Sequence, residues 1–396
     1  MPFIRFNDTT ADIYKYTIMR IAIFHSFMDN IGGAEMVTLT LARELHAHVY
    51  TTNLNTDRIE EMGFKDVIPR IHSIGKVPIQ APFRHQMASY RFWRLKLKGQ
   101  YDFFIISGDW AMSGAVHNSP NIWYAHCPLH ELWAFVDKIK AKMIPKWQVP
   151  LYEFWVKWNR KFTLSYANHI NGWVCNSENT RQRILKYYKR NATIIFPPTY
   201  TSKYSPREKG DYWLSVNRLL ANKRVEIQLK AFSKLPNEKL IIVGSYERGA
   251  RQFESYKQYL ESVQPKNVEI RHWVPQDELI DLYSKSKGLI ITSEQEDFGM
   301  TAIEAMASGK IVIAPNEGGY KETILNGKTG ILINDINEDR LRDTILALEN
   351  NSLSQIAYSE KESLLQAQKY DVAVFIKHIR DKISSVKDTA RDTAKQ

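Results

Sequence analysis

The sequence has very little cysteine and no long apolar run. Cys127 and Cys175 are the only cysteines among 396 residues, too few for a disulfide framework or a zinc site. No stretch of about 18 apolar residues occurs, so the sequence predicts no transmembrane helix. The segment ahead of Met19 lacks the apolar block of a signal peptide, and Met19 is an alternative start of translation. These absences predict a cytoplasmic protein.

Acidic residues are scarce in only one half of the chain. Residues 1–200 contain 25 lysines and arginines against 15 acidic residues, whereas residues 201–396 contain 29 against 28. Of the net charge of +11, the first half therefore carries +10 and the second half +1. A basic half beside a neutral one predicts that the first half contacts a polyanionic surface, either nucleic acid or an anionic membrane.

Two segments hold much of the basic excess, one from Arg84 to Lys98 and the other from Lys138 to Lys161. Both interleave cations with aromatic residues. Cations attract anionic headgroups and indole rings favour the membrane interface, so the pattern predicts peripheral contact with an anionic membrane. Single-stranded nucleic acid would also suit the composition. No nucleic-acid recognition motif is present, and no specific nucleic acid partner is predicted.

Residues 151–164 are predicted to form an amphipathic helix within the second basic segment. Phe154, Trp155 and Trp158 fall roughly on one side of this helix. Docking of that side on a membrane is one interpretation. The alternative is a solvated helix whose aromatic side chains face the core of the domain.

The first half alternates predicted strands and helices. An apolar run at residues 21–25 predicts a buried parallel strand, and a loop containing Gly32 and Gly33 leads into a helix over residues 36–45. Two glycines before a helix allow close approach of a ligand to the helix's positive end, although a simple turn uses glycine too. Further strands are predicted at residues 48–52, 103–107, 122–124, 172–176 and 193–196.

The second half repeats this alternation with helices of about ten residues between strands. It predicts a second parallel sheet, and the proline-containing stretch near residues 197–210 predicts a linker. The fold class is therefore α/β with two Rossmann-like domains, residues 1–200 and 201–369. The strands of the second domain are predicted at residues 212–216, 240–243, 268–271, 289–292, 311–314 and 330–333.

The stretch from Gly288 to Ala314 reads as strand, loop, helix, loop and strand. Its acidic loop follows the carboxyl end of a parallel strand, where open α/β sheets bind ligands. Backbone N–H groups around Met300 and Thr301 are predicted to face an anion such as a diphosphate. Glu296 and Glu304 would accept hydrogen bonds from the hydroxyls of a polyhydroxylated ligand.

The spacing of Glu296 and Glu304 resembles the E-x7-E signature of the family 4 retaining glycosyltransferases of the GT-B fold. The resemblance implies a nucleotide-sugar donor, GDP- or UDP-linked, in the cleft between an acceptor-binding first domain and a donor-binding second domain. It also implies that a terminal helix within residues 370–396 packs back on the first domain, although residues 384–396 are polar and predicted to fray. No cofactor and no metal are implied.

Three further segments match the same family. Trp123 to Pro128 resembles its Tyr-x-His-x-Pro segment, which implies that His126 lies beside the transferred sugar. That segment is common in enzymes with mannose-type donors, but the arginine that often follows is absent here, so the donor sugar stays open. Arg218 and Lys223 match the pair that grips the donor's phosphates, although Asn217 stands where the family often has glycine. With Glu296, the implied catalytic residues are His126, Arg218 and Lys223.

The resemblance also implies which residues surround the donor. They are Gly32, Gly33, Gly244, Trp273, Val274, Asp297, Phe298, Gly299, Met300, Thr301 and Glu304.

The predicted activity is transfer of a hexose, with mannose as the first candidate, to a glycan or lipid-linked acceptor on the inner face of the cytoplasmic membrane. Cations beside the departing diphosphate would stabilise its developing charge. Three alternatives stay open: a GT-B nucleotide-sugar epimerase, a non-enzymatic protein that binds nucleotide sugars, and a basic scaffold that binds nucleic acid with a steep salt dependence.

Overall fold

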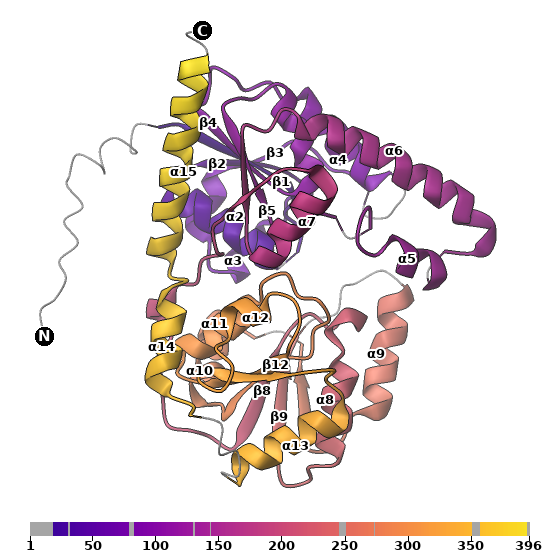
Figure 1. Cartoon of the computed structure of the whole chain (residues 1–396), viewed down its shortest axis with the longest axis vertical. Helices are drawn as coiled ribbons and strands as arrows, with labels where there is room; N and C mark the ends of the chain where they lie inside the picture. The colour runs from indigo at the N-terminus through magenta and orange to yellow at the C-terminus, as the bar shows by residue number, and fades with distance from the viewer. Residues whose placement is uncertain are drawn as a thin grey trace, which may run out of the picture. The chain divides into compact units, whose positions relative to one another are not determined.

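The chain folds into two compact units, shown in a computed structural model (Figure 1). The first unit contains the chain up to Asn176, then Thr180–Phe196 and Phe375–Gln396. The second unit contains Ser177–Asn179 and Pro197–Val374. The described residues are 19–30, 32–78, 83–129, 131–142, 144–244, 251–272, 274–350 and 357–393.

The first unit is built on a seven-stranded sheet in the order β3-β2-β1-β4-β5-β6-β7, and every neighbouring pair is parallel. Its central strands β4 and β5 are buried along their whole length, as expected for a parallel sheet covered on both faces. The strands are β1 (Ile21–Phe27), β2 (His48–Thr52), β3 (Ile71–Ser73), β4 (Phe103–Ser107), β5 (Asn121–Ala125), β6 (Gly172–Cys175) and β7 (Thr193–Ile194).

Helices cover this sheet and connect its strands. Two of them, α4 and α6, pack on the same short helix η2 and are joined by a 3.1 Å hydrogen bond from Gln86 to Asn159. The helices are α2 (Gly33–Glu44), α3 (Thr56–Glu61), α4 (Arg84–Arg94), α5 (Val136–Lys142), α6 (Val149–Ala167), α7 (Glu178–Tyr188) and α15 (Val372–Thr393), with the 3₁₀ helices η1 (Lys65–Arg70), η2 (Asp109–Val116) and η3 (Lys146–Gln148).

The terminal helix α15 packs against the first unit from Phe375 onward. The rings of Phe375 and Tyr124 meet edge to face at 5.9 Å between centroids. Gly172 of β6 leaves room for Val386 of α15, since a Cβ atom at Gly172 would lie 2.6 Å from that side chain. The predicted fraying of residues 384–396 is wrong for most of this segment, because α15 continues to Thr393 and buries Val386.

The second unit is built on a six-stranded parallel sheet in the order β10-β9-β8-β11-β12-β13. The strands are β8 (Tyr212–Val216), β9 (Lys239–Val243), β10 (Val268–Arg271), β11 (Gly288–Ile290), β12 (Ile311–Pro315) and β13 (Gly330–Ile333). The helices are α8 (Val225–Ser233), α9 (Arg251–Val263), α10 (Gln276–Lys285), α11 (Met300–Ala307), α12 (Tyr320–Thr323), α13 (Glu338–Glu349) and α14 (Glu360–Gln368), with the 3₁₀ helices η4 (Thr201–Lys203) and η5 (Ala221–Lys223).

The strand orders fix where each unit can bind a ligand. In the first unit the order reverses between β1 and β4, and in the second between β8 and β11. Loops diverge at such switch points and leave room for a ligand at the carboxyl ends of the strands. Ligand-binding residues are therefore expected in the segments that follow β1, β4, β8 and β11.

The predicted fold class is confirmed, since both units are parallel sheets covered by helices. Each predicted strand is present; β2, β4, β8, β10 and β13 have the predicted ends, and the ends of the others differ by one or two residues. The three-residue strand β3 was not predicted, because so short a segment carries no recognisable alternation. Across the described residues, no helix is both long and apolar enough to cross a membrane.

Candidate active site

The conformation of the loop between β11 and α11 is fixed by two tightly packed glycine turns. Gly299 precedes α11 with φ of +90°, a conformation that suits glycine, and a Cβ atom there would collide with the ring of Tyr320. Gly318 has φ of +60°, and its neighbour Gly319 would place a Cβ atom 2.5 Å from the Cα of Phe298. The Gly319 N–H donates a 2.8 Å hydrogen bond to the Glu296 carbonyl. The glycine turn thus supports the loop from behind.

Lys223 and Glu296 form an ion pair at this loop. The Lys223 Nζ lies 2.5 Å from Oε2 of Glu296, and 13% of the lysine side chain and 25% of the glutamate side chain are exposed. The hydroxyl of the buried Tyr320 also interacts with Glu296. Sequence reasoning assigned these two residues to phosphate and to sugar hydroxyls, and the structure brings them into direct contact.

Arg224 locks the loop after β8 to the loop after β11. Its Nε donates a 2.6 Å hydrogen bond to the Thr292 carbonyl, and its terminal nitrogen pairs with the Glu317 carboxylate. In return the Thr292 hydroxyl donates to the Lys223 carbonyl at 2.7 Å. Arg224 has φ of +49°, which is uncommon outside glycine, asparagine and aspartate. Sequence reasoning missed Arg224, and its place directly after Lys223 was the only available signal.

Glu304 lies one turn inside α11, directed at two tyrosines. The Tyr283 hydroxyl donates a 2.7 Å hydrogen bond to its carboxylate, and the Tyr204 hydroxyl also bonds to it. Burial raises the pKa of Glu304 to about 7, although both hydroxyls favour the ionised form. The residue as a whole is half-buried. Glu304 can therefore change its protonation state near neutral pH.

The remaining predicted residues of the second unit occupy the same edge of the sheet. Arg218 is exposed just beyond β8, and Gly244 just beyond β9 lies against the carbonyl of Asn217. Val274 is buried after β10, whereas Trp273 lies outside the described residues. Four of the others belong to the β11–α11 segment, namely Asp297, Phe298, Met300 and Thr301.

In the first unit, the glycine pair lies at the start of a helix as predicted, but this helix begins at Gly33 and not at Met36. Gly32 directly precedes α2 and Gly33 is the first residue of that helix. A Cβ atom at Gly32 would lie 2.5 Å from Oε2 of Glu35, so the glycine makes room for this carboxylate. Glu35 in turn lies 3.8 Å from Nε2 of His25, a buried residue near the end of β1.

His126 directly follows β5 and ends a chain of buried polar groups. Its Nε2 lies 2.8 Å from Oγ of Ser107, which lies 2.7 Å from Oγ1 of Thr38. The Thr38 hydroxyl lies 3.0 Å from Nδ1 of His25. Polar groups without a partner are costly in such a buried region, so this chain holds the His126 ring in place.

Each hydroxyl in this chain can donate or accept, and the carboxylate of Glu35 beside Nε2 of His25 favours one of the two directions. His126 donates from Nε2 to Ser107, Ser107 donates to Thr38, and Thr38 donates to Nδ1 of His25. His25 then carries its proton on Nε2, facing Glu35. Sequence reasoning missed His25, Thr38 and Ser107, because only the fold brings residues of β1, α2 and β4 together.

A metal ion would require a cluster of ligands. No group of three or more His, Cys, Asp or Glu side chains placed to hold one occurs among the residues that the structure describes. The charged groups of the second unit's site are arranged instead as cations next to single carboxylates.

Two family models match the chain. The model for Glycosyltransferase Family 4 matches residues 31–202, and the model for Glycosyl transferases group 1 matches residues 198–364.

The chain matches some curated relatives over most of their length and others over about half of their length. The alpha-1,3/1,6-mannosyltransferase ALG2 of Dictyostelium discoideum is 25% identical over 391 residues, covering 81% of this chain and 87% of the relative. The mannosylfructose-phosphate synthase of Agrobacterium fabrum is 24% identical, covering 85% of each protein. An uncharacterized glycosyltransferase of Methanocaldococcus jannaschii is 28% identical over 45% of this chain and 49% of the relative.

Solved structures share the fold over almost the whole chain. Anabaena HepE, crystallised with UDP-glucose, superposes with a TM-score of 0.73 at 17% identity, covering 93% of this chain and 100% of HepE. Sucrose-phosphate synthase from Thermosynechococcus elongatus gives a TM-score of 0.72 at 16% identity, covering 94% and 100%. The solved structures show the GT-B fold, and the two family models, which together match residues 31–364, show that the chain is a glycosyltransferase of family 4.

Proposed function

We propose that the chain transfers a hexose from a nucleotide diphosphate sugar to a glycan or lipid-linked acceptor, with retention of the anomeric configuration and without a metal. The observation that carries the proposal is the contact between Lys223 and Glu296, because a cation of the kind that binds a diphosphate lies beside a carboxylate of the kind that binds sugar hydroxyls. The mannosyltransferase relatives and the UDP-glucose complex of HepE support a nucleotide-sugar donor. Mannose, linked to GDP or UDP, is the sugar we propose.

Cleavage of the bond to the diphosphate develops negative charge on the leaving oxygens. In the proposal Lys223 and Arg218 stabilise this charge, aided by the backbone N–H groups of Met300 and Thr301 at the start of α11. The cations and the helix end supply the neutralisation that a metal would otherwise provide. Lys223 needs little reorganisation, because its ion pair with Glu296 already holds the ammonium in the loop.

The hydroxyls of the donor are bound by carboxylates in this proposal. Glu296 accepts hydrogen bonds from the sugar, and Glu304 accepts them from the ribose. His126 lies beside the transferred sugar, with its ring orientation fixed by Ser107. The departing phosphate takes the proton of the acceptor hydroxyl, which attacks the oxocarbenium-like sugar from the same face and so retains the configuration.

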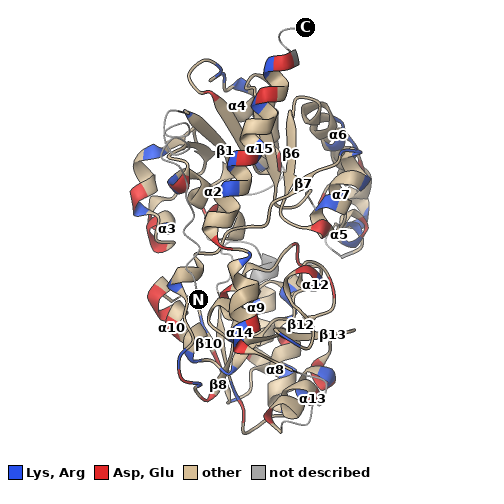
Figure 2. Ribbon diagram, turned by 60° about the vertical axis from the view of Figure 1, so that its left-hand side comes forward, with Lys and Arg blue, Asp and Glu red and all other residues tan. Residues whose placement is uncertain are grey.

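We also propose that the first unit docks on the anionic inner face of the cytoplasmic membrane. Exposed apolar side chains form a stripe on α6, which consists of Leu151, Phe154, Trp158 and Phe162, with exposed fractions of 68%, 61%, 51% and 42%. Figure 2 shows cations along α5 and α6. Apolar side chains in contact with water favour transfer to a membrane interface, and nearby cations attract anionic headgroups.

The predicted side of α6 is partly wrong. Trp155 lies on the inner side of the helix, 6.5 Å between ring centroids from the buried Trp110, and packs with His85. Phe154 and Trp158 stack on each other at 5.9 Å and do face solvent. The alternative that the aromatic side chains of this helix face the core therefore holds for Trp155 but not for Phe154 and Trp158.

Removal of the Lys223 ammonium should reduce catalysis strongly. Two unit charges about 4 Å apart interact by about 4 kcal/mol at an effective dielectric constant of 20, so Lys223→Ala should lower kcat/KM about a thousandfold. The measurement is release of the nucleoside diphosphate from the donor. Lys230→Ala removes an exposed lysine of α8 and should leave kcat/KM unchanged. Equal rates for the two variants would remove Lys223 from the mechanism.

Donor affinity should depend on the protonation of Glu304. An ionised carboxylate accepts ribose hydroxyls, and its pKa is about 7, so affinity should rise about tenfold between about pH 6 and pH 8. Isothermal titration calorimetry measures this. The Glu304→Gln variant should bind weakly with no such dependence. An unaltered protein whose affinity is the same at both pH values would refute the assignment.

The same shift predicts how stability depends on pH. The folded chain favours protonated Glu304 because burial raises the pKa of this group. Its contribution to the free energy of unfolding is therefore complete below the ordinary pKa of 4.5 and is lost as the pH rises through the folded-state pKa of about 7. Part of any loss of unfolding free energy over this window should disappear in Glu304→Gln.

Loss of the Ser107 hydroxyl should change the environment of the His126 ring and slow the transfer reaction. Ser107→Ala removes a group in contact with both His126 and Thr38, and the loss of about 1–3 kcal/mol per broken buried bond predicts a ten- to hundredfold slower transfer. Nitrogen NMR shifts of the His126 ring should change with it. Ser113→Ala is the matched control, because Ser113 is buried in the same unit but bonds to backbone carbonyls. Unchanged His126 shifts would contradict this role.

The apolar stripe should control vesicle binding. Phe154→Ser with Trp158→Ser removes two half-exposed aromatic rings, and the lost burial should weaken binding to vesicles tenfold or more, as an order of magnitude. Sedimentation with phosphatidylcholine–phosphatidylglycerol vesicles measures this. Leu346→Ser, at an exposed leucine of α13 in the second unit, is the control. Equal binding of all three proteins would remove the membrane proposal.

A further inference from the structure

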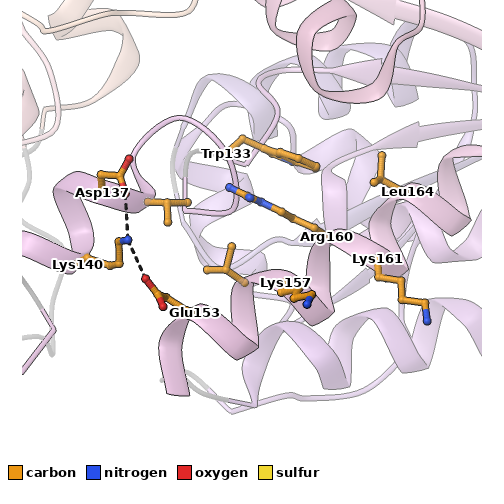
Figure 3. A pocket seen from close by; sticks show the side chains of 10 residues that line it. Trp133, Asp137, Lys140, Glu153, Lys157, Arg160, Lys161 and Leu164 are labelled. Atoms are coloured by element: carbon orange, nitrogen blue, oxygen red, sulfur yellow. Dashed lines mark hydrogen bonds and ion pairs between the residues drawn. The ribbon is translucent and has the colours of Figure 1, made fainter. Parts of the chain in front are cut away.

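A pocket of about 630 Å³ lies between α5 and α6 in the first unit, lined by Trp133 and by one face of α6 (Figure 3). Its volume falls within the range of small-molecule sites. The pocket plays no part in the donor chemistry proposed above. Its α6 lining repeats at intervals of three and four residues, which places it on one face of the helix, and consists of Glu153, Val156, Lys157, Arg160, Lys161 and Leu164.

The charges in this pocket are divided unevenly between its two ends. At one end the single ammonium of Lys140 lies 2.9 Å from Glu153 and 3.1 Å from Asp137, so two carboxylates share one cation and one negative charge remains there (Figure 3). At the other end Lys157 and Lys161 are exposed and make no ion pair with any residue that the structure describes. This end therefore has a surplus of positive charge.

Arg160 adds a third cation with a fixed position. Its Nε donates a 2.6 Å hydrogen bond to the Leu132 carbonyl, and its guanidinium lies 4.9 Å from the centre of the Trp133 ring. Trp133 itself stacks on Tyr187 at 5.0 Å. An arginine held in this way is preorganised to bind a phosphate, since little side-chain freedom is left to lose.

The helical repeat places this cationic end next to the apolar stripe of α6. At about 100° per residue, Lys157 and Lys161 fall between the pocket face, centred near Arg160, and the stripe that contains Phe154 and Trp158. One helix thus presents, side by side, cations at a pocket and apolar side chains in water. A molecule with a phosphate head and a hydrocarbon tail matches both surfaces.

We propose that this pocket binds the phosphate or diphosphate of a membrane lipid, whose chains lie along the apolar stripe of α6. The proposal rests on the membrane docking proposed above and specifies the group that is recognised. An anionic phospholipid and a lipid-linked acceptor share this chemistry. The site lies on helices of the first unit, and the donor chemistry of the second unit does not depend on it.

The first test removes the two unpaired lysines from the full chain. Lys157→Gln with Lys161→Gln should weaken binding to phosphatidylcholine–phosphatidylglycerol vesicles about thirtyfold, since each lysine near an anionic surface contributes about 1 kcal/mol. Lys230→Gln with Lys266→Gln removes the same charge from exposed positions in the second unit. The proposal requires the control pair to bind as the unaltered protein does. An equal loss in both pairs would show a general charge effect and overturn it.

The second test asks what the pocket itself recognises. The indole resonance of Trp133, assigned with Trp133→Phe, is followed by NMR during titration with short-chain phosphatidylglycerol or with inorganic pyrophosphate. A shift with the lipid alone, or with both probes, supports the proposal, and the second result shows that the phosphate suffices. A shift with pyrophosphate alone identifies a site for free anions, and no shift identifies an empty surface; either overturns it.

These readouts measure binding and do not depend on turnover. A protein that fails to turn over any nucleotide sugar but passes both tests would contradict the proposed transfer reaction and leave the lipid pocket intact. A protein that transfers sugar but fails both tests would do the reverse.

Discussion

The ion pair between Lys223 and Glu296 is the interaction on which the second unit's site depends. It lies at the point where the strand order reverses, so the loops after β8 and β11 meet there. Both loops are fixed by Arg224 and Thr292, and a glycine turn packs behind them. The sheet, the turns and the buried Tyr320 together hold the ammonium of Lys223 beside the carboxylate of Glu296. In the proposed function, the phosphate groups of a ligand contact the ammonium and its hydroxyl groups contact the carboxylate.

The two units contribute different chemistry. The second unit offers charged groups, among them Glu304, whose burial brings its pKa to about 7. The first unit offers a chain of neutral hydroxyls and imidazoles that ends at His126. A charged site suits the diphosphate and hydroxyls of a donor, whereas a rigid neutral network suits the positioning of one ring. The basic face of α6 adds a third kind of surface, suited to a phosphate next to apolar material.

Much of the fold could be predicted from the sequence because buried parallel strands are nearly continuous apolar runs, as in Phe103–Ser107. Glu296 and Lys223 were predicted through a family resemblance, and the structure confirms only that they lie together. Arg224 could not be predicted, since its role depends on a left-handed backbone conformation. Ser107 and Thr38 are separated by 69 residues and meet only in the folded sheet. The prediction of the side of α6 on which Trp155 lies was wrong, because packing against the core of the first unit decides that side.

Donor binding tests the central claim most directly. The protein is heated in the presence of a panel of UDP- and GDP-sugars, and its melting temperature is compared with that of the unliganded protein. A ligand at about a hundred times its Kd stabilises a fold by about 2.7 kcal/mol, so at least one sugar nucleotide should raise the Tm by several degrees. A panel in which none of the nucleotide sugars changes the Tm would contradict the account.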